Sequence, residues 1–161
     1  MLNRKGFTLV ELLAVVFIIS ALAFVAIPSY MNSLKESRIA EAQMILKKVG
    51  EANATFLRDY PNYGITQKIT NANTNKVHTN KDCNPADYAS RQSSVFTQCG
   101  YLNKENWDNS YFDIYVCNPK ATSFPTGSCC AKGRYAGMYY DKNKCYYIDK
   151  SAELQFIGVN L

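Results

Sequence analysis

Residues 1–30 read MLNRKGFTLVELLAVVFIISALAFVAIPSY, and this stretch limits how the whole chain can fold. From Phe7 to Ile27 it is apolar apart from one acid, Glu11. An apolar helix of about 20 residues is long enough to cross a bilayer. A carboxylate within it costs roughly 2.5–3.5 kcal/mol near the bilayer centre and less near the edge. The sequence therefore raises the question of which group Glu11 pairs with.

The helical pattern continues beyond the apolar run. Apolar residues recur at spacings of mostly three and four, with charged residues on the other faces, which is typical of an amphipathic helix packed on another element. These apolar residues are Leu34, Ile39, Ala42, Ile45, Leu46, Val49, Ala52, Phe56 and Leu57. We expect one helix from about residue 7 to about residue 59, ending before Tyr60-Pro61. We expect a kink at Pro28, because proline lacks an N–H and crowds the preceding turn.

The C-terminal part predicts an antiparallel sheet. Residues 60–110 are polar and we expect an irregular loop there, whereas residues 111–159 are rich in β-branched and aromatic residues. Four strand patterns lie at 111–117, 134–140, 144–149 and 153–159. The turn sequence DKN at 141–143 predicts a hairpin between the second and third of them. The expected fold is α+β, a long helix packed on three or four strands.

Six cysteines lie in the C-terminal half and indicate disulfides in an oxidising compartment. A zinc site is the alternative, but the sequence has no CxxC pair and one histidine, His78. Cys129 and Cys130 are adjacent and should have different partners. The shortest loops give the pairs Cys83–Cys99, Cys117–Cys129 and Cys130–Cys145, and exchanging Cys129 with Cys130 is the alternative. We expect structural bridges, because nothing nearby in the sequence would lower a thiol pKa.

Neither composition nor motifs indicate catalysis or nucleic-acid binding. The net charge of +5 is too mild to argue for nucleic acid by itself. The sequence contains no phosphate-binding loop, HExxH motif or EF-hand pattern, and His78 has no catalytic partner at a recognisable spacing. The tyrosines on the predicted strands, 12 in the whole chain, are interpreted as cross-strand packing. We therefore expect no enzyme, no metal site and no cofactor.

The order of features at the N-terminus resembles the signature of prepilins, the precursors of type IV pilin subunits. The matching residues are RKGFTLVELL at 4–13 and IPSY at 27–30. The resemblance implies that a membrane peptidase cuts between Gly6 and Phe7 and methylates the new amine of Phe7. It also implies that Glu11 is an assembly acid, whose carboxylate meets the amine of a neighbouring subunit. Such pairing would remove an uncompensated buried charge and fix the axial register.

The resemblance also implies a layout, a location and partners. Residues 1–6 would be the leader, 7–30 the transmembrane and polymerisation helix, and 31–161 the periplasmic or extracellular head. The chain would be a pilin that assembles with copies of itself into a type IV pilus serving adhesion, twitching motility or DNA uptake. It would reside in the inner membrane before assembly and in an extracellular fimbrium afterwards. Prepilin peptidase and the pilus assembly machinery would be its partners, and nucleic acid would not be a primary one.

Other interpretations remain open on the sequence. The chain could be a pseudopilin of type II secretion, a minor pilin, or a surface module that binds DNA or host ligands. The segment NWDN at 106–109 lacks the glycine of the tryptophan-glycine motif of major pseudopilins, which favours a pilin. A secretory signal peptide ending near Ala21-Leu22-Ala23 and a plain single-span anchor are further alternatives. Glu11 and the long continuation of the helix argue against the signal peptide.

Overall fold

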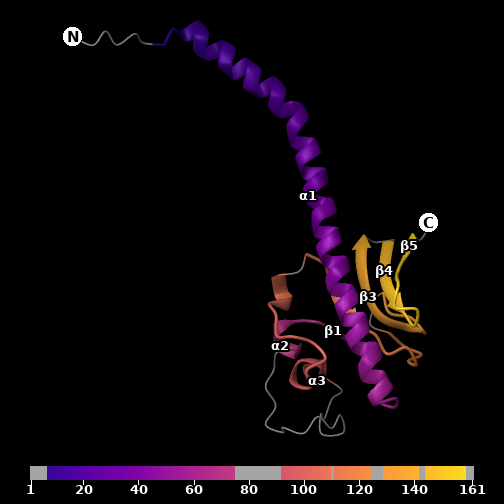
Figure 1. Cartoon of the computed structure of the whole chain (residues 1–161). Helices are drawn as coiled ribbons and strands as arrows, with labels where there is room; N and C mark the ends of the chain where they lie inside the picture. The colour runs from indigo at the N-terminus through magenta and orange to yellow at the C-terminus, as the bar shows by residue number, and fades with distance from the viewer. Residues whose placement is uncertain (1–6, 75–91, 110, 125–128, 142–143, 159–161) are drawn as a thin grey trace. The chain divides into compact units, whose positions relative to one another are not determined.

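The computed structural model describes residues 7–74, 92–109, 111–124, 129–141 and 144–158. It divides into two compact units, Met1–Arg38 and Ile39–Leu161, which are described separately. Helix α1, Leu9–Asp59, contributes to both units (Figure 1). The helix ends next to Tyr60, because a residue that precedes a proline, here Pro61, disfavours helical backbone angles. The Tyr60 N–H still donates to Phe56 O at 2.8 Å.

In the first unit, α1 exposes its apolar side chains all round. Phe17 and Phe24 are 78% and 84% exposed, and Phe7, which precedes the helix, is 79% exposed. Within the described residues, α1 is the one helix that is long and apolar enough to cross a membrane. A contiguous apolar surface of this size is rare on a soluble monomer and marks contact with lipid or with other proteins.

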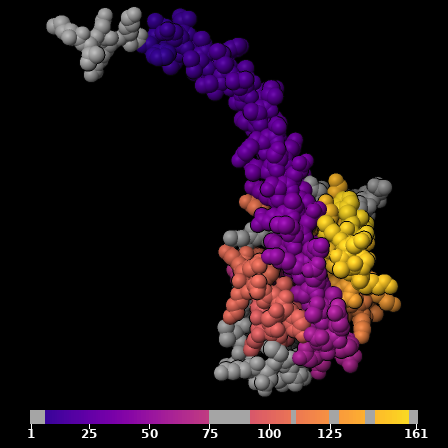
Figure 2. Space-filling view, in the orientation of Figure 1, coloured from indigo at the N-terminus to yellow at the C-terminus, as the bar shows by residue number. Residues whose placement is uncertain are grey.

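In the second unit, one face of α1 packs on the sheet and forms the core. The predicted apolar stripe is buried at Ala42, Leu46, Val49, Ala52 and Phe56, while Ile45 and Leu57 are partly buried. These residues pack with Val116, Ala136, Met138 and Ile148 of the sheet. In Figure 2 the last turns of α1 lie between the 92–109 segment on one side and β3 to β5 on the other. The predicted packing of the helix on an antiparallel sheet is confirmed.

Within the described ranges, the sheet has five antiparallel strands in the order β1-β2-β3-β4-β5. They are β1 Gln67–Lys68, β2 Ile114–Val116, β3 Arg134–Asp141, β4 Lys144–Asp149 and β5 Leu154–Gly158. Strands β2, β4 and β5 lie within the predicted ranges, whereas β3 extends one residue beyond its range, to Asp141. Strands β3 and β4 form the predicted hairpin pair. The expectation of three or four strands is corrected to five. The added strand, β1, has only two residues, too few to show an alternating pattern.

The segment between helix and sheet is more ordered than its polar sequence predicts. Its described part contains α2 Asn71–Thr74, α3 Ser94–Gln98 and the 3-10 helix η2 Trp107–Asn109. Side-chain hydrogen bonds hold these turns together: Asn71 Oδ1 accepts from the Trp107 N–H at 2.8 Å, and Asn71 Nδ2 donates to Asn106 Oδ1 at 2.8 Å. Trp107 is 6% exposed and belongs to the core. The irregular loop expected over 60–110 is corrected accordingly, since such short helices leave no periodic signal.

Asn53 is a fully buried polar residue on the packed face of α1. Its Nδ2 donates to Cys117 O at 2.8 Å and to Tyr135 O at 2.7 Å, so one amide joins the helix to the ends of β2 and β3. The Cys117 N–H also donates to Tyr135 O, at 2.9 Å. Buried polar groups are costly unless paired, so the two bonds donated by Nδ2 fix the helix at one position on the sheet, while Asn53 Oδ1 has no hydrogen-bond partner within the described part of the chain.

The disulfides differ from the shortest-loop prediction. The structure pairs Cys117 with Cys130 and Cys129 with Cys145, with Cα–Cα distances of 5.4 and 6.0 Å. The predicted pairs Cys117–Cys129 and Cys130–Cys145 are therefore wrong, and the exchanged alternative is correct. Of the pair Cys83–Cys99, Cys83 lies outside the described residues, so that bridge remains a prediction.

The reason for the exchange is the backbone at Cys129. Its φ of 55° lies in the left-handed region and turns the chain between the two cysteines. Cys130 Sγ then lies 3.7 Å from Val116 O at the end of β2, whereas Cys129 Sγ lies 3.4 Å from Tyr146 O on β4. Loop length alone carries no information about this change of direction.

Gly50 provides a test of the helix–sheet contact. A Cβ added there would lie 2.6 Å from Ile148 Cγ2 and 2.7 Å from Ile148 Cβ. Helix propensity favours Gly50→Ala by up to about 1 kcal/mol, but overpacking costs typically ~1–3 kcal/mol. We expect Gly50→Ala to lower the melting temperature, measured by circular dichroism on the full chain in detergent. Ala40→Gly, at an exposed position of the same helix, is the control for propensity alone. A raised melting temperature for Gly50→Ala would contradict the close packing.

Candidate functional site

The predicted assembly acid lies in the first turn of α1 and is bonded to Thr8. Glu11 Oε2 accepts the backbone N–H of Thr8 at 2.9 Å and its hydroxyl at 2.8 Å. In return, the Glu11 N–H donates to Thr8 Oγ1 at 3.3 Å. This reciprocal arrangement is a capping box, which satisfies backbone donors at the start of a helix. The carboxylate also lies at the helix N-terminus, where the partial positive charge of the helix dipole favours an anion.

The capping box was missed in the sequence analysis, although its signal was present. Residues 8–11 read TLVE, which is the [ST]-x-x-[DE] pattern directly before an apolar run. The capping box lowers the free-energy cost of removing the Glu11 carboxylate from water. In the single chain Glu11 already accepts two hydrogen bonds, so part of its desolvation is offset before any subunit contact forms.

The geometry leaves room for a second partner at Glu11. An ionised carboxylate has about four acceptor positions, and Thr8 occupies two of them. Both bonds hold Oε2 toward the start of the helix, where Phe7 precedes Thr8. The side chain of Phe7 is 79% exposed, and Gly6 lies outside the described residues. A cation presented from outside could therefore bind Glu11 without displacing the cap.

At Pro28, α1 continues without interruption. Nearby serines bond back to the helix: Ser20 Oγ donates to Val16 O at 2.7 Å, and Ser33 Oγ donates to Ser29 O at 3.2 Å. Such back-bonds satisfy hydroxyl groups within an apolar helix. The kink at Pro28 remains a prediction.

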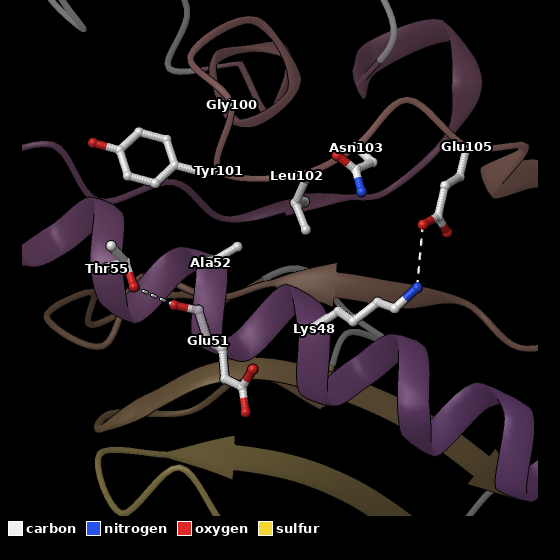
Figure 3. A pocket seen from close by; sticks show the side chains of 9 residues that line it. All are labelled: Lys48, Glu51, Ala52, Thr55, Gly100, Tyr101, Leu102, Asn103 and Glu105. Carbon is white, nitrogen blue, oxygen red and sulfur yellow. Dashed lines mark hydrogen bonds and ion pairs between the residues drawn. The ribbon is translucent and has the colours of Figure 1, made fainter.

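A groove of about 520 Å³ lies in the second unit, between one flank of α1 and residues 100–105 (Figure 3). Lys48 Nζ and Glu105 Oε1 bridge its walls at 3.2 Å. Tyr101 donates its hydroxyl to Asp59 Oδ2 at 2.5 Å, and burial together with this carboxylate raises the pKa of the phenol. The lining residues include no nucleophile beside a base, so we assign no chemistry to the groove.

The other residues weighed for chemistry do not form a site in the described part of the chain. No group of three or more His, Cys, Asp or Glu side chains that could hold a metal occurs among the described residues. His78 lies outside them. The exposed start of α1, with Thr8 and Glu11, is therefore the candidate functional site.

Comparisons with known proteins agree with this assignment. Residues 1–27 match the family model of the prokaryotic N-terminal methylation motif. The type IV major pilin protein PilE of Neisseria gonorrhoeae is 40% identical over 65 residues, 40% of this chain and 37% of that protein. The type IV major pilin protein PilA of Myxococcus xanthus is 39% identical over 61 residues, 38% of this chain and 28% of that protein. The type IV major fimbrial protein FimA of Dichelobacter nodosus is 41% identical over 56 residues, 35% of this chain and 36% of that protein.

These similarities cover part of each relative. The aligned segments span 28–37% of the length of these three proteins. No solved structure matches the chain. The resemblance to type IV pilins is confirmed by the motif and by these relatives.

Proposed function

We propose that this chain, with its N-terminal methylation motif and its likeness to type IV major pilins, is the subunit of a type IV pilus. Residues 1–6 would be removed as a leader, residues 7–30 would span the inner membrane and then form the filament core, and residues 31–161 would form the head. The assembled fibre, an extracellular fimbrium, would serve adhesion, twitching motility or DNA uptake. The prepilin peptidase and the assembly machinery would act on the chain, and it would need no cofactor.

The observation that carries this proposal is the capped acid Glu11 at the start of α1. The apolar part of α1 that follows, in the first unit, has no buried residue. Cleavage after Gly6 would create an ammonium group at Phe7, four residues before Glu11. In a stack of helices, the amine of one copy would meet the carboxylate of its neighbour. The pair would add charge-assisted hydrogen bonds to the two that Thr8 donates. Apolar contact alone would permit sliding, whereas this pair selects one axial position.

The three relatives described are major pilin or fimbrial proteins, which supports the pilus over a secretion pseudopilus. Fibres sheared from cells that express the chain should contain it as their main polypeptide, identified by mass spectrometry. Fibre-free supernatants from cells that hold the processed chain in the membrane would contradict the proposal.

Processing is tested at the proposed scissile bond. Gly6→Glu would place a charged side chain where the peptidase needs an unobstructed backbone. We expect the uncleaved precursor to accumulate in the membrane fraction, with a mass that includes residues 1–6. The measurement is intact-protein mass together with N-terminal sequencing. Asn3→Glu adds the same charge within the leader but away from the bond and should be cleaved normally. A Gly6→Glu product that begins at Phe7 would overturn the cleavage assignment.

A further inference from the structure

A guanidinium group lies beside one of the two described disulfides. Arg134 Nη1 is 3.6 Å from Cys145 Sγ, 3.9 Å from Cys129 Sγ and 2.9 Å from Cys129 O, to which it donates. The guanidinium also lies over the ring of Tyr147, with Cζ 4.0 Å from the ring centroid. A hydrogen bond and a cation–π contact thus hold one permanent positive charge against both sulfurs.

From this geometry we infer that Cys129–Cys145 is a redox-responsive bridge whose reduction is favoured by Arg134. A nearby cation stabilises a thiolate, and stabilising the reduced form makes a disulfide easier to reduce. Cys129 and Cys145 are 5% and 6% exposed, so solvent screens the attraction between the guanidinium and a thiolate only weakly. The spacing of Arg134 and the cysteines in the sequence does not show this contact, because Cys145 and Tyr147 lie on a different strand.

The step balances with a dithiol as the reductant. A dithiol thiolate attacks one sulfur of the bridge, and the other sulfur leaves as a thiolate that faces Arg134. The second thiol of the reductant, after losing its proton, closes on the mixed disulfide and releases the remaining cysteine. Two electrons pass from the dithiol to the bridge, and the reductant becomes a disulfide. The loop that carries Cys129 then separates from β4 but stays tied to the end of β2 by Cys117–Cys130.

The test uses the full chain in detergent, equilibrated with mixtures of reduced and oxidised dithiothreitol. After acid quenching and alkylation, peptide mass spectrometry reports the reduced fraction of each cysteine pair. For Arg134→Met we expect Cys129–Cys145 to require an about ten-fold higher ratio of reduced to oxidised reagent, which corresponds to about 30 mV. The midpoint of Cys117–Cys130 should not move, and it serves as an internal reference. Lys132→Gln, which removes a charge from the same loop at an exposed position, should leave both midpoints unchanged.

Two further variants separate charge from folding. Arg134→Lys keeps a cation, so the midpoint of Cys129–Cys145 should stay close to the wild-type value. Tyr147→Leu removes the stacking partner, so its midpoint should lie between those of wild type and Arg134→Met. These two variants decide the outcome if Arg134→Met fails to fold. An unchanged Cys129–Cys145 midpoint in Arg134→Met, or equal shifts of both bridges, would overturn the inference. None of these results depends on whether the chain forms a pilus.

Discussion

Glu11→Val should insert into the membrane and be cleaved normally, yet yield almost no sheared fibre. Removing one partner of a buried ion pair leaves the other charge uncompensated, at a cost of about 3–5 kcal/mol. That cost corresponds to roughly two to four orders of magnitude in subunit affinity. The measurement compares the amount of subunit in sheared fibres with the amount of cleaved subunit in membranes. Fibre at the wild-type level would contradict the pairing of Glu11 with the amine.

Two matched variants separate the charge of Glu11 from its capping contact. Glu11→Gln retains an oxygen that can accept from Thr8, as glutamine also serves in a capping box, but it lacks the charge. Thr8→Val removes the hydroxyl and keeps the acid. If the ion pair drives assembly, Glu11→Gln should resemble Glu11→Val, and Thr8→Val should retain most of the fibre. The reverse order would show that the cap, and not the charge, is what assembly requires.

Asn53→Asp should strongly destabilise the second unit at neutral pH. The carboxylate would face Cys117 O and Tyr135 O, which now accept hydrogen bonds of 2.8 and 2.7 Å from the Asn53 amide. A buried charge opposed to two carbonyl oxygens costs several kcal/mol, which is a large share of a typical stability of about 5–15 kcal/mol. Fluorescence of the buried Trp107 and thermal melts in detergent should report a melting temperature lower by about 10 °C or more.

The effect of Asn53→Asp should depend on pH in a defined direction. Burial would raise the pKa of the new carboxyl group above its unfolded value near 4. The variant should therefore be most stable below that unfolded value and lose stability as the pH rises through the folded pKa. Thr55→Ala is the control, since it removes an exposed bond from Oγ1 to Glu51 O on the same helix. A melting temperature for Asn53→Asp within a few degrees of wild type at neutral pH would show that the amide is dispensable.

The sequence predicted the helix and the strands whose apolar residues recur at a regular spacing. Leu46, Val49 and Phe56 follow the helical repeat and are buried, and the patterns around β3 and β4 alternate as paired strands do. What it could not predict depends on single residues in three dimensions. The two-residue strand β1 and the turn at Cys129 leave no periodic signal, and the turn decides which cysteine reaches Cys117.

Single residues also differ in how far the sequence alone indicates their role. Glu11 stands out in the sequence because it interrupts an apolar run, and the Thr8 contact could have been recognised from the capping pattern. Asn53 could not be distinguished from a surface asparagine by spacing alone, because its role comes from two carbonyl groups more than 60 residues away in the chain. Arg134 likewise gains its partners from β4, which a linear view of the cysteines does not show.

The adjacent cysteines also affect how the head would respond to mechanical tension. Cys130 is joined to Cys117 at the end of β2 and Cys129 to Cys145 on β4, while β3 lies between those two strands. A pulling force along the chain would pass through the two disulfides and the peptide bond between Cys129 and Cys130, so the segment between Cys117 and Cys145, which contains all of β3, would carry no load. Stretching could therefore lengthen the polypeptide only outside that segment, and β3 could not be drawn out while both bridges stay intact.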